Sequence, residues 1–291
     1  MEDVVPAVLE REASRLFSTA VFRAVATGKS TQRADAATSK IRGGLGLGRN
    51  VTNHEVVEVA YDLLRRSYRS EYFYRNLLAS KVFVGRHRAA RSVLLNEFRV
   101  GDSVADCVLV NGRGAVYEIK TEFDSPEKLR SQLASYYRAF PYATVVAHTD
   151  DADRYLRLVE DGPAGLITVG PRDRLSVVKD ADAKTDSFDI RTMFNALRLS
   201  EVTGILQAEY GALPAVPNGV RYAVYLELAE QMSPTAFQAG MQAALKTREL
   251  RNSRSLMLAS SFAPLRAVVA QLDPDEQQQS RLLSWLNSRG A

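Results

Sequence analysis

An Asn-Gly pair, Asn111-Gly112, lies between two short apolar runs and constrains the fold more than any other feature of the sequence. Asn-Gly favours tight hairpin turns, because such turns need positive φ angles that these two residues adopt at little cost. The runs on either side, 105–110 and 115–121, are therefore predicted to pair as antiparallel strands. A further strand is predicted over 96–100, directly before the hairpin.

Helical and extended patterns alternate after the hairpin. The sequence predicts a helix that begins at Asp124 or Ser125, has Pro126 in its first turn and runs to about Phe140. Strands are predicted over 143–148 and 164–169, with a helix over 151–160 between them. Three strands followed by helix, strand, helix and strand predict an α+β (mixed α/β) fold, in which helices flank a mixed sheet.

Helical patterns also dominate both flanks of this sheet-forming stretch. We divide the sequence into a helical N-terminal region (1–80), a sheet-containing core (81–200) and a helical C-terminal region (201–291), with a linker at 211–219. Within the first region, residues 28–50 interrupt the helical pattern, and the glycine-rich run 43–48 is predicted as a loop. A phosphate-cradling loop would need a strand before it, and no strand pattern precedes this run. Ser233-Pro234 is predicted to start one helix and Asp273-Pro274 to start the last.

Composition excludes several classes of protein. The 291 residues are 46% hydrophobic and 25% charged, as in ordinary globular domains. No window of ~18 uncharged apolar residues predicts a membrane span, and the acidic start lacks the pattern of a signal peptide. One cysteine and three histidines cannot form an internal disulfide or a thiolate-rich zinc site. We expect a cytoplasmic protein.

Acidic residues gather around the hairpin. Glu118 and Lys120 are two apart on a predicted strand and so share one face, while Ile119 points the other way. Asp106 lies across the turn, and Glu97 lies on or before the first strand. Clustered carboxylates repel one another unless a cation is bound, and hard oxygen ligands suit Mg²⁺ or Mn²⁺. The alternative is a surface strand that carries an ordinary salt-bridge pattern.

The spacing of these residues resembles the motif of the PD-(D/E)XK nuclease superfamily, with Asp106 followed by Glu118-Ile119-Lys120. Ala105 departs from the family's proline, and Gln132 with Tyr136 resembles the QxxxY motif of the RecB-like branch. The resemblance implies a restriction-endonuclease-like core and Mg²⁺-dependent hydrolysis of phosphodiester bonds, in DNA rather than RNA. It implies the following roles: Asp106, Glu118, the Ile119 carbonyl and Glu97 at the metal, Lys120 at the attacking water, and Gln132 and Tyr136 in support.

Several blocks between about residues 70 and 200 also resemble an uncharacterised bacterial family of the "sce" type, which is usually placed in the same superfamily. The blocks are Tyr72–Asn76, Gly85–His87, Asn96–Gly101, Ala105-Asp106, Asn111-Gly112, Tyr117–Lys120 and Asp124-Ser125. The Tyr-Glu-Ile-Lys block is the most specific of them. This resemblance supplies no substrate, and the superfamily suggests a setting in defence or repair.

Positive charge is concentrated in residues 1–100, which hold 17 lysines and arginines against 10 acids. Arg86, His87, Arg88 and Arg91 form a compact group for which phosphate contacts are predicted. The alternative for this basic region is a solvated helical surface. The predicted partner is nucleic acid, with no membrane, and the helical flanks could form a homo-oligomer or protein interface.

Two rival functions remain open. One is a nucleic-acid-binding module with a nuclease-like fold but no turnover, which a Glu118 locked in a salt bridge would favour. The other is a partner-regulated interaction protein, which an exposed apolar face on the C-terminal helices would favour.

Overall fold

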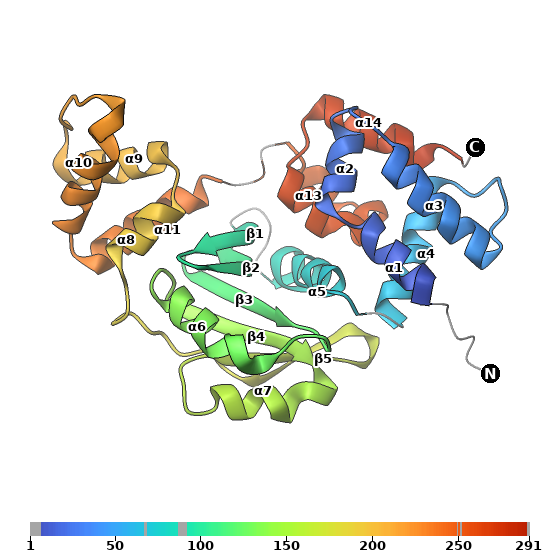
Figure 1. Cartoon of the computed structure of the whole chain (residues 1–291), viewed down its shortest axis with the longest axis horizontal. Coiled ribbons are helices and arrows are strands. Elements are labelled where there is room, and N and C mark those ends of the chain that lie inside the picture. The colour runs from blue at the N-terminus through green and yellow to red at the C-terminus, as the bar shows by residue number, and fades with distance from the viewer. Residues whose placement is uncertain (1–6, 67–68, 87–91, 249, 251, 290–291) are drawn as a thin grey trace. The chain divides into compact units, whose positions relative to one another are not determined.

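The computed structural model describes residues 7–66, 69–86, 92–248, 250 and 252–289. Its contacts divide the chain into two compact units: a helical unit, residues 1–86 and 250–291, and a sheet unit, residues 87–249 (Figure 1). These boundaries differ from the three regions drawn from the sequence. The predicted C-terminal region is divided between the two units, because its first helices pack beside the sheet and its last ones pack among the N-terminal helices.

The helical unit contains no sheet among its described residues. Its elements are α1 (Ala7–Leu16), α2 (Thr19–Ala26), α3 (Gln32–Leu45), α4 (Asn53–Arg66), α5 (Glu71–Leu78), a π-helical segment (Ala79–Arg86), α12 (Arg254–Leu258), a 3₁₀ segment (Ser260–Leu265), α13 (Arg266–Leu272) and α14 (Glu276–Asn287). Aromatic rings join them: Phe17 stacks on Tyr72 with centroids 4.6 Å apart, and Phe22 meets the edge of Trp285 at 5.9 Å. In the described part of the chain, no helix is both long and apolar enough to cross a bilayer.

The prediction of a break over residues 28–50 was wrong, because α3 occupies most of that segment. Ala34, Ala37 and Ile41 are buried at helical spacing, so packing overrides the weak helix propensity of the glycines. Gly44 lies so close to α1 that a Cβ atom would come within 2.4 Å of Leu9 Cδ2. Gly46, with φ +63°, ends the helix in the left-handed conformation. These glycines therefore serve close packing and capping.

Asn53 joins the two halves of the helical unit at the start of α4. Its side-chain amide donates to the Trp285 carbonyl and to Ser288 Oγ, both at 3.0 Å, and its backbone N–H donates to the Ser288 carbonyl at 2.8 Å. The last helix, α14, begins at Glu276 with the Asp275 side chain as its cap, just after the predicted Asp273-Pro274. Asp273 instead ends α13 in a left-handed conformation.

The sheet unit contains one mixed sheet of six strands in the order β1-β2-β3-β4-β5-β6. The strands are β1 (Val93–Val100), β2 (Ser103–Val110), β3 (Gly114–Lys120), β4 (Tyr142–His148), β5 (Gly165–Gly170) and β6 (Arg174–Lys179). β1, β2 and β3 form an antiparallel meander, β3, β4 and β5 run parallel, and β6 is antiparallel to β5. The predicted mixed α+β fold is confirmed, while the edge strand β6 was not predicted.

The Asn-Gly hairpin is confirmed between β2 and β3. Val110 pairs with Gly114, and the Asn111 N–H donates to the Arg113 carbonyl at 3.2 Å. Gly112 has φ +100°, which a residue with a side chain rarely adopts. The turn sets the register that places Cys107 opposite Tyr117, and so fixes which side chains meet further along the hairpin.

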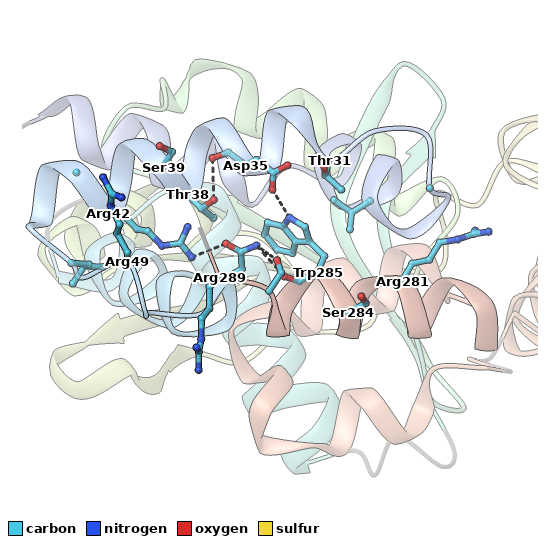
Figure 2. Close-up of a pocket in the computed structure, with 16 residues that line it drawn as sticks. Thr31, Asp35, Thr38, Ser39, Arg42, Arg49, Arg281, Ser284, Trp285 and Arg289 are labelled. Atoms are coloured by element: carbon cyan, nitrogen blue, oxygen red, sulfur yellow. Dashed lines mark hydrogen bonds between the residues drawn. The ribbon is translucent and has the colours of Figure 1, made fainter. Parts of the chain in front are cut away.

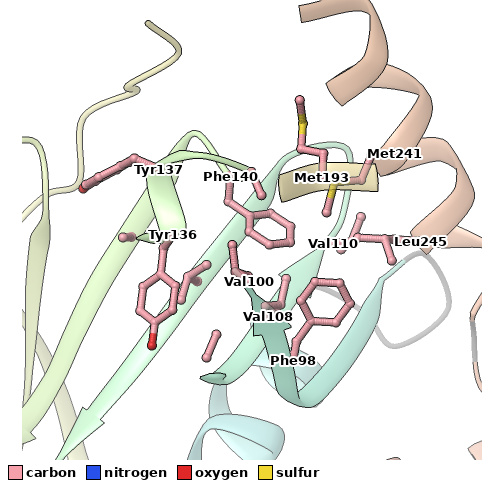
Figure 3. Close-up of a cluster of buried hydrophobic side chains, with 14 of the residues drawn as sticks. Phe98, Val100, Val108, Val110, Tyr136, Tyr137, Phe140, Met193, Met241 and Leu245 are labelled. Carbon is pink, nitrogen blue, oxygen red and sulfur yellow. The ribbon is translucent and has the colours of Figure 1, made fainter. Parts of the chain in front are cut away.

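Two helices, α6 (Leu129–Tyr137) and α7 (Ala152–Val159), connect the parallel strands and pack on the sheet. Their apolar side chains share a core with β1–β5 and with the helices that follow: α8 (Ile190–Ala196), α9 (Leu199–Tyr210), α10 (Asn218–Glu230) and α11 (Pro234–Lys246). Figure 3 shows Phe98 and Phe140 at the centre of this core with Met193 and Met241. The predicted linker at 211–219 is the connection from α9 to α10, inside this unit.

Candidate functional site

Asp106 and Glu118 face each other across the hairpin. The pairing of Cys107 with Tyr117 places Asp106 opposite Glu118, one residue further from the turn. Asp106 Oδ2 accepts a hydrogen bond of 2.6 Å from the Ile119 N–H, which fixes the carboxylate against β3. Two carboxylates on facing residues repel each other unless nearby positive charge or hydrogen-bond donors offset the repulsion.

Glu118 is only 2% exposed, and both of its carboxylate oxygens accept hydrogen bonds. Oε1 accepts from Lys120 Nζ at 2.9 Å and from Gln132 Nε2 at 2.6 Å. Oε2 accepts from the Tyr136 hydroxyl at 2.6 Å. A buried carboxylate is tolerated when it is paired and fully hydrogen-bonded, as it is here.

Lys120 closes a triangle with Glu118 and Gln132. Lys120 is only 5% exposed. Its ammonium group donates to Glu118 Oε1 at 2.9 Å and to Gln132 Oε1 at 2.8 Å. The Gln132 amide therefore accepts from the cation with its oxygen and donates to the carboxylate with its nitrogen. We call Asp106, Glu118, Lys120, Gln132 and Tyr136 the acid–lysine cluster.

The helix α6 supplies two members of the acid–lysine cluster. Gln132 and Tyr136 are four residues apart, so they lie on one face of α6, and that face packs on the sheet. The Tyr136 hydroxyl lies 2.6 Å from Glu118 Oε2 and 3.0 Å from the Val104 carbonyl. Burial raises the pKa of Tyr136, and the negative charges of Glu118 and Asp106 raise it further. The hydroxyl therefore stays protonated and acts as a donor to Glu118.

Glu97 lies beside Asp106 on the neighbouring strand. Asn96 pairs with Cys107 and Phe98 with Ala105, so Glu97 is opposite Asp106. Its side chain is exposed and its backbone has φ +53°, which is uncommon for a residue other than glycine. Such local strain costs of the order of 1–3 kcal/mol and tends to occur at functional positions. The register of β1 and β2 therefore places the backbone of Glu97 beside that of Asp106.

The metal donors predicted from the sequence are only partly assembled. Among the described residues, no group of three or more aspartate, glutamate, histidine or cysteine side chains is placed to hold an ion. Of the predicted donors, Asp106 and Glu118 lie opposite each other on β2 and β3, and both oxygens of Glu118 already accept hydrogen bonds. Two carboxylates and a carbonyl are a sparse but chemically suitable set for Mg²⁺, which keeps several of its waters.

The predicted phosphate-contacting residues lie mostly outside the described part of the chain. His87, Arg88 and Arg91 are not described, and Arg86 is described only as the last residue of the π-helical segment. A second group of cations lies in the helical unit, and no local sequence pattern predicts it. Arg42, Arg49, Arg281 and Arg289 line one pocket there, although they come from segments far apart in the sequence.

These observations define a mixed α+β protein whose sheet carries a buried cluster of carboxylate, lysine, glutamine and tyrosine. The chain belongs to the family described as Bacteriophage P4 protein cII, whose family model matches residues 65–267. The matched region includes the whole acid–lysine cluster, and the description of the family names no activity. Comparison with curated proteins and with solved structures found no match.

Proposed function

We propose that the sheet unit hydrolyses phosphodiester bonds of nucleic acid, with DNA as the first substrate to test, in a reaction that depends on Mg²⁺ or Mn²⁺. The observation that carries the proposal is that α6 brings Gln132 and Tyr136 onto the same Glu118 carboxylate that Lys120 contacts. Residues chosen from the PD-(D/E)XK and QxxxY resemblances thus form one cluster of hydrogen bonds, which a chance match of letters would not require.

The divalent ion would be held by Asp106, by Glu118 and by the Ile119 carbonyl, with Glu97 beside them. When bound, it would supply charge neutralisation for the phosphodiester and lower the pKa of a coordinated water. The chain's own residues would do the positioning. Gln132 and Tyr136 orient the Glu118 carboxylate, and the Lys120 ammonium would provide positive charge to a phosphate or an attacking water.

A second candidate is a nucleic-acid-binding module with this fold and no turnover. It is favoured by the same contacts, because Lys120, Gln132 and Tyr136 occupy both oxygens of Glu118. In this alternative the lysine neutralises Glu118 permanently and the cluster is a structural element of the core. The two candidates differ in whether Glu118 exchanges the lysine for a metal ion.

The deciding experiment is cleavage of supercoiled plasmid and of linear single- and double-stranded DNA, with Mg²⁺ or Mn²⁺ against EDTA. The wild-type protein is compared with Lys120→Ala and with the control Lys128→Ala, which removes an exposed lysine of the same unit. We expect metal-dependent cutting by wild type and control, and a loss of about a hundredfold or more in Lys120→Ala.

Equal cutting by all three proteins would reject the acid–lysine cluster as the active site. No cutting by any of them, on DNA or on RNA, would reject the hydrolase. DNA binding in EDTA by the wild type and by Lys120→Ala alike would then support the binding module.

Size-exclusion chromatography of the same samples tests for self-association, because Leu199, Val220 and Tyr222 leave apolar side chains exposed on α9 and α10.

A further inference from the structure

The helical unit contains a pocket of about 980 Å³, lined by residues of α3, of the segment that follows it and of α14 (Figure 2). Its volume is near the upper end of the range of ligand pockets, about 300–1,000 Å³. The walls are held together by specific bonds. Trp285 Nε1 on α14 donates to Asp35 Oδ1 on α3 at 2.8 Å, and Asn53 bonds to the Trp285 carbonyl at 3.0 Å.

The charge in this pocket, which we call the arginine pocket, is strongly positive. Four arginines line it, Arg42, Arg49, Arg281 and Arg289, against one acid, Asp35. In the described part of the chain, none of the four makes an ion pair. Asp35 lines the pocket and Glu55 lies near enough to Arg289 for their charges to interact, so among the described residues the four arginines outnumber the nearby acids by two.

Arg42 is the most constrained of the four. It is only 8% exposed, and its Nη2 atom donates to the Val51 carbonyl at 2.9 Å and to Asn53 Oδ1 at 2.8 Å. Both acceptors are neutral, and Arg42 Nε is buried with no hydrogen-bond partner. Burying a cation without a counter-charge is unfavourable, so an anion in the pocket would offset a cost that the protein alone leaves in place.

We propose that the arginine pocket binds a phosphate group, carried by nucleic acid or by a free nucleotide. Guanidinium groups bind phosphate with paired hydrogen bonds and stay charged at all relevant pH values. Ser39 and Ser284 line the same pocket, and a serine hydroxyl can donate to a phosphate oxygen. The arginine pocket shares no residue with the acid–lysine cluster, so a test of phosphate binding is independent of a test of hydrolysis.

The chain has one tryptophan, Trp285, and it lines the pocket, so its fluorescence reports on binding there directly. The full-length protein would be titrated in EDTA with inorganic phosphate, with a nucleoside triphosphate and with a short oligonucleotide. We expect a saturable change in emission that weakens with added salt. Tightest binding by the oligonucleotide would identify nucleic acid as the source of the phosphate, and tightest binding by the nucleotide would identify a free nucleotide.

The variants Arg49→Glu and Arg289→Glu test whether the pocket is responsible, since both arginines are exposed and can be replaced without disturbing the core. The control is Arg33→Glu, an exposed arginine on α3 outside the pocket that changes the net charge equally. We expect binding about tenfold weaker in each pocket variant and within about twofold of wild type in the control.

Thermal unfolding with and without phosphate gives a second readout, because a ligand that binds the folded state raises Tm. The wild-type Tm should rise with phosphate, and the rise should shrink in Arg49→Glu but not in Arg33→Glu. The proposal is overturned if no probe changes the Trp285 emission at millimolar concentration, or if the control loses as much affinity as the pocket variants.

Discussion

The acid–lysine cluster of the sheet unit and the arginine pocket of the helical unit both bury charge, but they treat it in opposite ways. In the sheet unit, Glu118 meets the Lys120 cation and two further donors, so the charge is matched inside the protein. In the described part of the helical unit, the acceptors of Arg42 are two neutral oxygens. The difference indicates where a ligand would add most to stability: at the site whose charge the fold leaves unmatched.

Elsewhere in the sheet unit, a largely buried arginine is paired with a carboxylate. Arg248 donates to both carboxylate oxygens of Glu201, at 2.6 and 2.5 Å, and both side chains are largely buried. Arg42 has a similar degree of burial, and no carboxylate among the described residues pairs with it. The absence of a carboxylate at Arg42 is therefore a property of that pocket rather than of arginines in this chain.

The largest effect on stability is expected from Lys120→Ala. Removing one partner of a buried pair leaves Glu118 without its cation, which costs about 3–5 kcal/mol in the free energy of unfolding. Urea unfolding at neutral pH measures this loss, with Lys128→Ala expected within about 0.5 kcal/mol of wild type. Adding Glu118→Gln to Lys120→Ala should recover part of the loss, and no recovery would show that packing rather than charge is responsible.

The next effect compares the two buried arginines directly. Arg248→Met leaves the Glu201 carboxylate unpaired and should cost about 2–3 kcal/mol. Arg42→Met removes a cation that has no counter-charge, so its cost in phosphate-free buffer should be smaller, about 1 kcal/mol. Urea unfolding of both variants tests the comparison. If Arg42→Met is the more destabilising of the two, Arg42 is matched by something other than a ligand.

A smaller effect is expected from Tyr136→Phe, which deletes the hydroxyl that donates to Glu118. The loss of one hydrogen bond to a buried carboxylate should cost about 1–2 kcal/mol at pH 8.

The pH dependence of that cost follows from the raised pKa of Tyr136, which burial and the Glu118 charge hold well above the usual 10.0. The unfolded chain ionises this tyrosine near pH 10, while the folded protein resists ionisation. The stability gained from the hydroxyl is complete below pH 10 and is lost as pH rises through the folded-state pKa. The difference between wild type and Tyr136→Phe in urea should therefore shrink above about pH 10, and a constant difference would contradict the assignment.

The smallest effect is expected from Glu97→Gly. Glycine accepts φ +53° without strain but makes the unfolded chain more flexible, so the net change in stability should stay below about 1 kcal/mol. Glu97→Val should cost about 1–2 kcal/mol, because a β-branched residue is strained at positive φ. If Glu97 serves the metal site, both variants should lose cleavage, and cleavage retained by Glu97→Gly would remove Glu97 from the proposed site.

The contacts predicted correctly from the sequence are those that short-range rules determine. The Asn-Gly turn fixes the register of β2 and β3 and so brings Asp106 opposite Glu118. Helical spacing puts Gln132 and Tyr136 on one face of α6. These rules could not predict the hydrogen bonds that connect Gln132, Lys120 and Glu118, because those bonds depend on how closely α6 approaches the sheet.

The helical unit shows where sequence patterns fail. The glycines of α3 were assigned to a loop because their role depends on α1, which Gly44 must approach closely. The arginine pocket needs α3 beside α14, and no local pattern reports a contact between Asp35 and Trp285. The edge strand β6 was missed because its side chains are mostly exposed and do not alternate in the way that predicts a strand.

The bonds from Asn53 to Trp285 and Ser288 join residues that are 232 and 235 positions apart, so they cannot form until α14 has been synthesised. The ribosome makes residues 87–249 after the N-terminal helices and before α14, so the sheet unit is available to fold first. During that interval, the side chains of α2, α3 and α4 that will contact α14 have no partner from it. A chain cut before α14 would therefore keep every residue of the sheet unit but would lose the bonds that Asn53 and Asp35 make to α14.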